Sequence, residues 1–229
     1  MGNIMNYSII QAETNNYDQI YDCLDHKAKH HILITDQVQS AASWEQRIIT
    51  PTIGYPFDDI FKIRWNPFEY TDSEYVIWLD GSIRVMGDLD IYINMMQAGN
   101  YDFATIRHPY RTNIFDEYIA WINMRHYPIA KAFWWMTFME RTGYNLDSHG
   151  LYQVNVCIFK NTPIVKEYAK RVWDMLHLFD TKHAERLDQT IATYVLKHFY
   201  SSCINVLPLQ DSIYINSNTL CIHGKHPNK

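Results

Sequence analysis

Apolar residues along this chain fall into short unbroken runs that alternate with longer segments in which apolar residues recur every three or four positions. The short runs are typical of buried strands, and the longer spacing is typical of helices that cover a sheet. The runs predict strands over 7–11, 31–35, 76–79, 101–106, 152–159, 205–209 and 212–215, with a short strand or turn over 43–49. The spacing predicts helices over 17–24, 58–68, 91–99, 116–124, 129–142, 164–178 and 184–200.

Predicted strands alternate with helices through the first half of the chain, and strands return near its end. This order indicates an α/β fold with a central mixed, mostly parallel sheet flanked by helices. A length of 229 residues fits one large domain or two small ones. No repeat, low-complexity tract or change of composition marks a linker, so we expect a single domain over residues 1–229.

The most informative stretch joins the apolar run 76–79 to Asp80, Gly81 and Ser82. Open α/β sheets bind ligands at the carboxyl ends of their strands. Asp80, with Ser82 two residues later, could therefore meet a divalent cation that carries a diphosphate, and oxygen ligands suit Mg²⁺ or Mn²⁺. The alternative is a two-residue β-hairpin turn between 74–79 and 82–86, in which Asp80 only forms the turn.

Composition narrows the function classes. Apolar residues make up 47% of the chain and aromatic residues 15%, which excludes a disordered protein. The net charge of −5 argues against a nucleic-acid partner, so an anionic ligand would need a metal or a few placed Lys and Arg residues. No secretory signal and no apolar run long enough to span a membrane is present. The four separated cysteines are typical of free thiols in a reducing compartment, which predicts a cytoplasmic protein.

Several polar residues next to predicted strands are candidates for a site. Asp36 directly follows the run 31–35, and Lys62 and Arg64 precede the central strand, where ordinary surface charge is an equal alternative. Asn155 interrupts an apolar run, and a buried amide needs a hydrogen-bond partner, either a ligand or a backbone carbonyl.

Three basic residues, Arg107, His108 and Arg111, follow another strand and suggest an anion site, with a polar loop as the alternative. His26 and His30 have the spacing of metal ligands on a helix, although their charged neighbours favour a solvated surface. Trp134 and Trp135 suggest either a sugar-stacking platform or core packing.

Four motifs occur in an order that resembles GT-A fold glycosyltransferases, in particular glycosyltransferase family 8. They are LDGS at Asp80, QVNVCIFKN at Asn155, LDQT at Asp188 and Gln189, and HGKHP at His223, matching that family's D-x-D, N-x-G, D-Q and H-x-x-G-x-x-K-P elements. Three elements together, IWLDGSI, RHPYR and RLDQT, are also similar to uncharacterised glycosyltransferase-like domains. A small capsid-glycan glycosyltransferase domain of large algal viruses is a further likeness. The resemblance spans residues 7–227.

This chain departs from the family pattern at three points. Ser82 replaces the second aspartate of D-x-D, Cys157 replaces the glycine of N-x-G, and the terminal loop is two residues shorter, so that Lys225 precedes His226. These departures concern metal ligation more than the fold.

The resemblance implies a metal-dependent glycosyltransferase that moves a sugar, with retention, from a nucleotide diphosphate sugar to a glycan or glycoprotein acceptor. An inverting enzyme would instead need a carboxylate base near the acceptor hydroxyl, for which Asp116, Glu117 and Asp188 are equal candidates. The donor would be UDP-linked, and a viral protein would act in the host cytoplasm. The resemblance places Mn²⁺ or Mg²⁺ on Asp80, Ser82 and His223. The implied donor contacts come from Asp36, Lys62, Arg64, Asp80, Gly81 and Lys225. The implied catalytic residues beside the sugar are Asp188, Gln189 and Asn155.

Two other functions compete with this interpretation. A sugar nucleotidyltransferase would want a glycine-rich loop after the first strand, but the segment IIQAETNN contains no glycine. A non-catalytic domain that binds a glycan or a nucleotide sugar would be favoured by Ser82, because the D-x-D motif would then be degenerate.

Overall fold

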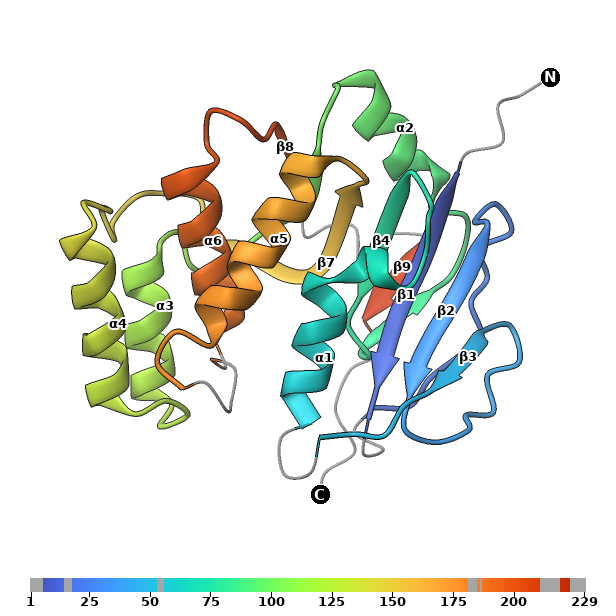
Figure 1. Ribbon diagram of the computed structural model, residues 1–229, viewed down its shortest axis with the longest axis horizontal. Helices are drawn as coiled ribbons and strands as arrows, with labels where there is room; N and C mark the ends of the chain where they lie inside the picture. The colour runs from blue at the N-terminus through green and yellow to red at the C-terminus, as the bar shows by residue number, and fades with distance from the viewer. Residues whose placement is uncertain are drawn as a thin grey trace.

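The computed structural model describes residues 6–14, 18–52, 56–180, 185, 187–210 and 219–222. Within them the chain forms a seven-stranded mixed sheet covered by helices on both faces (Figure 1). The fold class expected from the sequence is therefore confirmed. No helix in the described part of the chain is long and apolar enough to cross a membrane.

The main sheet has the order β3-β2-β1-β4-β7-β6-β8. Its strands are β1 (Tyr7–Glu13), β2 (His30–Thr35), β3 (Glu45–Ile48), β4 (Tyr75–Leu79), β6 (Phe103–Arg107), β7 (Tyr152–Lys160) and β8 (Val206–Leu209). Strands β3, β2, β1 and β4 pair in parallel, β6 pairs in parallel with β8, and only β7 runs antiparallel to its neighbours. The carboxyl ends of β2, β1, β4 and β6 consequently lie at the same end of the sheet, which we call its carboxyl edge.

A separate two-stranded sheet decides between the two interpretations of the central stretch. Strand β5 (Ile83–Val85) pairs antiparallel with β9 (Leu220–Ile222), whereas β4 pairs with β1 and β7. The hairpin alternative is therefore wrong, because the two runs on either side of Asp80 belong to different sheets. The predicted strand over 212–215 lies outside the described residues.

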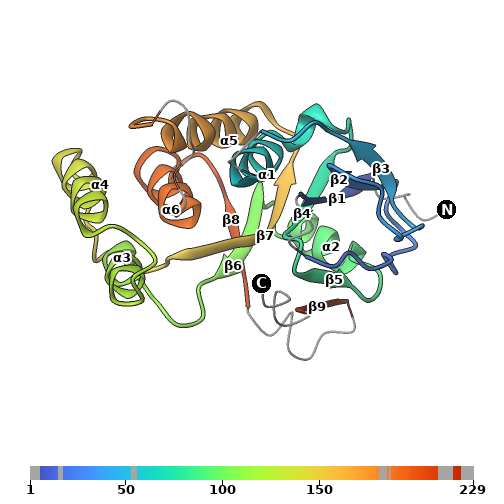
Figure 2. The same cartoon turned by 90° about the horizontal axis from the view of Figure 1, so that it is seen from below.

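The helices form layers around the sheet. They are α1 (Pro56–Trp65), a short 3₁₀ helix η1 (Pro67–Glu69), α2 (Asp90–Ala98), α3 (Ile114–Asn123), α4 (Ile129–Arg141), α5 (Pro163–Leu176) and α6 (Asp188–Phe199). Figure 2 shows α1, α5 and α6 on one face, α2 with β5 and β9 on the other, and α3 and α4 beyond the β6–β7 end. The single helix expected over 58–68 is broken, because Pro67 cannot continue it and starts η1 instead.

The alternation of side chains along β4 supplies both cores. Val76 and Trp78 face the core under α1, α5 and α6, whereas Ile77 and Leu79 face the core under α2 and β5. A strand buried on both faces explains the unbroken apolar run. Because Asp80 lies two residues after Trp78, its side chain points to the α1 side.

The helix predicted over 17–24 is wrong over its described part, residues 18–24, which contain no helix. Polar side chains hold this segment as a loop instead. Asp22 accepts a hydrogen bond from the backbone N–H of Ser43 (3.0 Å). Buried Asp25 accepts from the Tyr7 hydroxyl (2.6 Å) and the Leu89 N–H (2.6 Å). Short polar side chains that bond distant backbone groups compete with helix formation.

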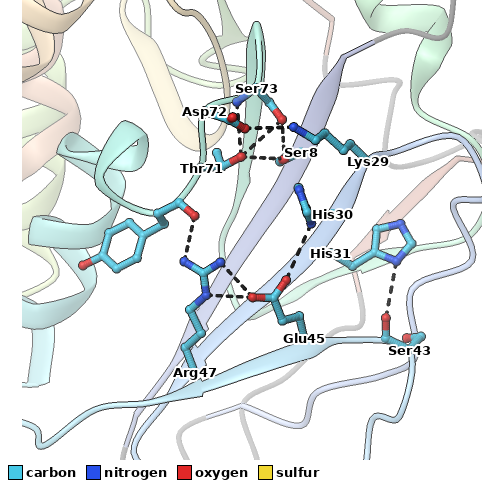
Figure 3. A network of polar contacts seen from close by, with 11 residues as sticks. Ser8, Lys29, His30, His31, Ser43, Glu45, Arg47, Thr71, Asp72 and Ser73 are labelled. Atoms are coloured by element: carbon cyan, nitrogen blue, oxygen red, sulfur yellow. Dashed lines mark hydrogen bonds and ion pairs between the residues drawn. The ribbon is translucent and has the colours of Figure 1, made fainter.

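Polar contacts also fasten the amino-terminal edge of the sheet, opposite the Asp80 edge (Figure 3). The Ser8 hydroxyl at the start of β1 lies 2.7 Å from the Ser73 hydroxyl ahead of β4. Lys29 pairs with Asp72 at 2.9 Å, and the Asp72 side chain is 85% exposed. These contacts hold the amino-terminal ends of the strands together. Because Lys29 and Asp72 lie at the end of the sheet opposite Asp80, they are suitable positions for control substitutions.

Candidate active site

Asp80 begins a tight turn at the carboxyl end of β4. Its backbone N–H donates to the Asn155 carbonyl (2.9 Å), and its carbonyl accepts from the Ile83 N–H (2.9 Å). The Gln11 side chain on β1 donates to the carbonyls of Asp80 (2.8 Å) and Ile83 (2.7 Å), which closes the turn from below. Buried carbonyls require such partners, so Gln11 fixes the position of the Asp80 carboxylate.

An irregularity in the sheet lies beside this turn. The β6–β7 register shifts between Thr105 and Ile106, which leaves β7 residues bulged around Asn155. The Thr105 hydroxyl stabilises the bulge by lying within hydrogen-bond distance of the carbonyls of Gln153 (2.9 Å) and Val156 (3.0 Å). A bulge re-aims the strand locally and is common next to functional sites.

Arg64 on α1 joins the two aspartates that the sequence singled out. Its Nη2 donates to Asp80 Oδ1 and its Nη1 to Asp188 Oδ2, and its side chain is 5% exposed. Its guanidinium also lies 5.2 Å from the Trp78 ring, whose Nε1 donates to Asp80 Oδ1 (3.1 Å). Surface charge is therefore the wrong interpretation for Arg64, whereas Lys62 is exposed.

One guanidinium cannot compensate the charges of two carboxylates, buried Asp188 and partly buried Asp80. Burial raises the pKa of Asp80, and it raises the pKa of Asp188 to about 6, although Arg64 opposes both shifts. Burial disfavours the Arg64 charge, but Asp188 and Asp80 outweigh it and raise the arginine's pKa. With both carboxylates ionised, the group of three carries one net negative charge, which favours a cation or a proton.

A second buried carboxylate cluster adjoins Asp188. Glu117 on α3 is fully buried and accepts hydrogen bonds from the side chains of Gln189, Arg111 and Trp121, the last at 2.6 Å. Its Oε2 also lies 3.8 Å from His108 Nε2. The Gln189 amide, expected beside the sugar, thus contacts Glu117, which the sequence offers as one of three candidate bases for an inverting transfer.

Three of the remaining predicted site residues lie at the same end of the sheet as Asp80, and two lie outside the described residues. Asp36 is partly buried at the end of β2, on the same edge of the sheet as Asp80, and Ser82 is partly buried in the turn. Gly81 lies in that turn as well. His223 and Lys225 lie outside the described residues.

Two further acids lie near the turn and were missed by the sequence reasoning. A Cβ added to Gly81 would be 2.8 Å from Asp18 Oδ2 and 3.2 Å from Glu13 Oε2. Glu13 ends β1, which extends two residues beyond the predicted strand 7–11. A longer strand would have placed this carboxylate at the same edge as Asp36 and Asp80.

The structure also places the histidine and tryptophan pairs. His26 is exposed in a turn and His30 begins β2, so they do not share a helix face. Trp135 is core, with Nε1 donating to Glu185 (2.8 Å), while Trp134 is half exposed.

The described residues contain no cluster of three or more His, Cys, Asp or Glu side chains suited to a metal ion. Asp80 nevertheless keeps an oxygen available: its side chain is 31% exposed, and Oδ2 makes no hydrogen bond or ion pair within the described part of the chain. Mg²⁺ is commonly held by one or two carboxylates together with substrate phosphates and water. Asp80 and Ser82 therefore fit a cation that arrives with a diphosphate.

A cavity of about 610 Å³ lies at the α3–α4 junction, lined by Ile122, Arg125, His126, Tyr127, Pro128, Ile129 and Lys131. None of the predicted site residues lines it. The candidate site is therefore the carboxyl edge of the sheet and not this cavity.

No protein-family model and no curated protein matches the sequence. Solved structures that the fold resembles include the glycosyltransferase GlyE of Streptococcus pneumoniae TIGR4, with a TM-score of 0.48 and 13% sequence identity. The match covers 89% of this chain and 45% of that chain, so this chain spans less than half of the GlyE structure. We therefore infer the function from the residues at the carboxyl edge of the sheet.

Proposed function

We propose that this chain is a glycosyltransferase that moves a sugar from a nucleotide diphosphate sugar to a glycan acceptor. The observation that carries the proposal is the contact of the buried Arg64 side chain with both Asp80 and Asp188 at the carboxyl edge of the sheet. It joins the D-x-D-like and D-Q motifs of the family resemblance in one place. An ion pair that only stabilised the fold would not need two carboxylates around one guanidinium, since such burial is costly.

The donor diphosphate would lie at the Asp80 turn. Asp80 Oδ2 and Ser82 would hold Mg²⁺ or Mn²⁺, and the bound cation would neutralise charge on the departing diphosphate. Arg64 would orient Asp80 through Oδ1 and leave Oδ2 to the ligand. His223 is proposed as a further ligand and Lys225 as a diphosphate contact, because β9 ends at Ile222 opposite Ile83, the residue after Ser82.

The sugar and the nucleoside would lie on either side of this point. Asp188 would accept hydrogen bonds from sugar hydroxyls, with Asn155 nearby, and Asp36 would contact the ribose or the base, proposed as uridine. Transfer breaks the bond between the anomeric carbon and the phosphate oxygen. The acceptor hydroxyl forms the new bond on the same face, and its proton passes to the leaving phosphate.

Hydrolysis of a panel of nucleotide sugars tests the proposal. We expect slow turnover that requires Mn²⁺ or Mg²⁺ and falls at least about 100-fold in Asp80→Asn, because the variant loses its charged cation ligand. Asp72→Asn removes an exposed aspartate at the opposite edge and should match the wild type. Equal background in wild type and Asp80→Asn, with nucleotide sugar still bound, would identify a non-catalytic binding domain instead.

A further inference from the structure

Arg111 lies between β6 and α3, and only one nitrogen of its guanidinium is held. Its Nε donates to Glu117 Oε2, whereas its two Nη groups make no hydrogen bond or ion pair within the described part of the chain. The side chain is 27% exposed. Since Nε is anchored, the four Nη hydrogens form a fixed end-on fork that matches two oxygens of an anion.

Glu117 determines where this fork points. Its other oxygen accepts from Trp121 and Gln189, so the carboxylate itself cannot rotate. Gln189 follows Asp188, which contacts Arg64. The Arg111 fork is thereby tied to the proposed reaction centre through adjacent residues of α6.

His108 fixes the loop that carries Arg111. Its Nδ1 accepts hydrogen bonds from the backbone N–H groups of Tyr110 (3.2 Å) and Arg111 (3.0 Å). Burial and the Arg111 charge lower the pKa of His108 to about 4, so the imidazole is neutral at neutral pH. A neutral His108 leaves Arg111 as the cation paired with Glu117.

The surroundings of this loop add positive charge. Arg107 ends β6. Burial and, to a lesser extent, the positive charge of Arg107 lower the pKa of Lys197 on α6. The segment just before β7 is bonded to the loop that carries Arg111, because the N–H groups of Gly150 and Leu151 donate to the Thr112 carbonyl (2.7 and 3.0 Å). Cations gathered at one edge of a protein of net charge −5 favour an anionic ligand there.

We propose that Arg111 binds a negatively charged group of the acceptor, a carboxylate or a phosphate, and that Glu117 positions it. The inference depends on the proposed function only because it identifies this ligand as the acceptor. Anion binding at Arg111 can be measured without catalysis, so a failure of this inference can be distinguished from a failure of the proposed glycosyl transfer.

NMR titration with three sugars of one skeleton tests the inference: methyl glucoside, glucuronate and glucose 6-phosphate, each with and without uridine diphosphate. We expect the wild type to bind one or both charged sugars about 10- to 100-fold more tightly than the neutral one. The Arg111 Nε–Hε resonance should shift with the charged sugars alone. The tighter of the two identifies the carboxylate or the phosphate as the recognised group.

Variants separate binding from folding. The double variant Arg111→Gln with Glu117→Gln removes both charges, so no buried carboxylate is left unpaired, and it should bind all three sugars equally. Arg111→Lys should retain part of the preference, and Lys29→Gln, at the opposite edge, all of it. Equal affinity of the wild type for the three sugars, or a preference that survives in the double variant, would overturn the proposal.

Discussion

Replacing Asp188 by Asn tests whether burial or Arg64 controls the charge at the candidate site. The Asp188 side chain is 10% exposed and shares one guanidinium with Asp80. Burial raises its pKa from 3.8 to about 6. The folded protein therefore holds a proton on Asp188 at pH values at which the unfolded chain has released it.

The sign follows from proton linkage. The contribution of Asp188 to stability is fully present below pH 3.8 and is lost as the pH rises through about 6. A separation from 3.8 to about 6 corresponds to about 3 kcal/mol in total, of which about 2 kcal/mol falls between pH 4.5 and 7.5. An asparagine does not titrate, so Asp188→Asn should gain about 2 kcal/mol relative to the wild type over that interval.

Urea unfolding at pH 4.5, 6.0 and 7.5 measures this difference. Asp174→Asn is the matched control, because Asp174 is an exposed aspartate that pairs with Lys170 on the surface, and its difference should stay within about 0.5 kcal/mol across the range. A pH-independent difference for Asp188→Asn would refute the reasoning. Loss of relative stability with rising pH would show that Arg64 outweighs burial and depresses the pKa.

Three further predictions concern other parts of the fold. Asp25→Asn should destabilise the protein by about 3 kcal/mol at pH 7 and by less at acid pH. The reason is that hydrogen bonds to the Asp25 carboxylate hold its pKa below its usual range despite burial. Urea midpoints measured across pH test this, because a raised Asp25 pKa would give the opposite trend. Gln11→Ala should cost about 1–3 kcal/mol by removing the two hydrogen bonds that its amide donates to carbonyls of the Asp80 turn, which thermal unfolding measures; an unchanged midpoint would show that the turn closes without them. Cys203 should react with a thiol reagent in the folded protein well before Cys157, whose pKa burial raises to about 12; equal labelling rates, read by mass spectrometry, would contradict the buried position of Cys157.

The sheet could be predicted from the sequence because its strands are short apolar runs ended by polar or turn residues. The run 76–79 and Asp80 emerged in this way, whereas Asp188, at the start of a helix, was singled out only by the family resemblance. The helix predicted over 17–24 is wrong because the spacing of apolar residues does not show which polar side chains bond to groups far away in the sequence. Asp25 bonds Leu89, and that contact holds the segment as a loop.

The side chains that complete the candidate site could not be predicted. Arg64 and Asp188 are 124 positions apart, and Glu117 and Gln189 are 72 apart. Without the strand order, Arg64 and Lys62 are indistinguishable cations on one helix. Only the packing of α1 against Trp78 buries the first and exposes the second.

The pairing of β5 with β9 also has a consequence for biosynthesis. The segment that leaves the Asp80 turn finds its partner strand only at residues 220–222, and the Met86 N–H reaches the Thr219 carbonyl (2.7 Å). A nascent chain that has emerged from the ribosome only as far as α6 would hold both aspartates of the candidate site but not this partner. Chains are synthesised at about 5–20 residues per second. Until residues 220–222 have emerged, β5 is an unpaired strand edge, which a chaperone can bind.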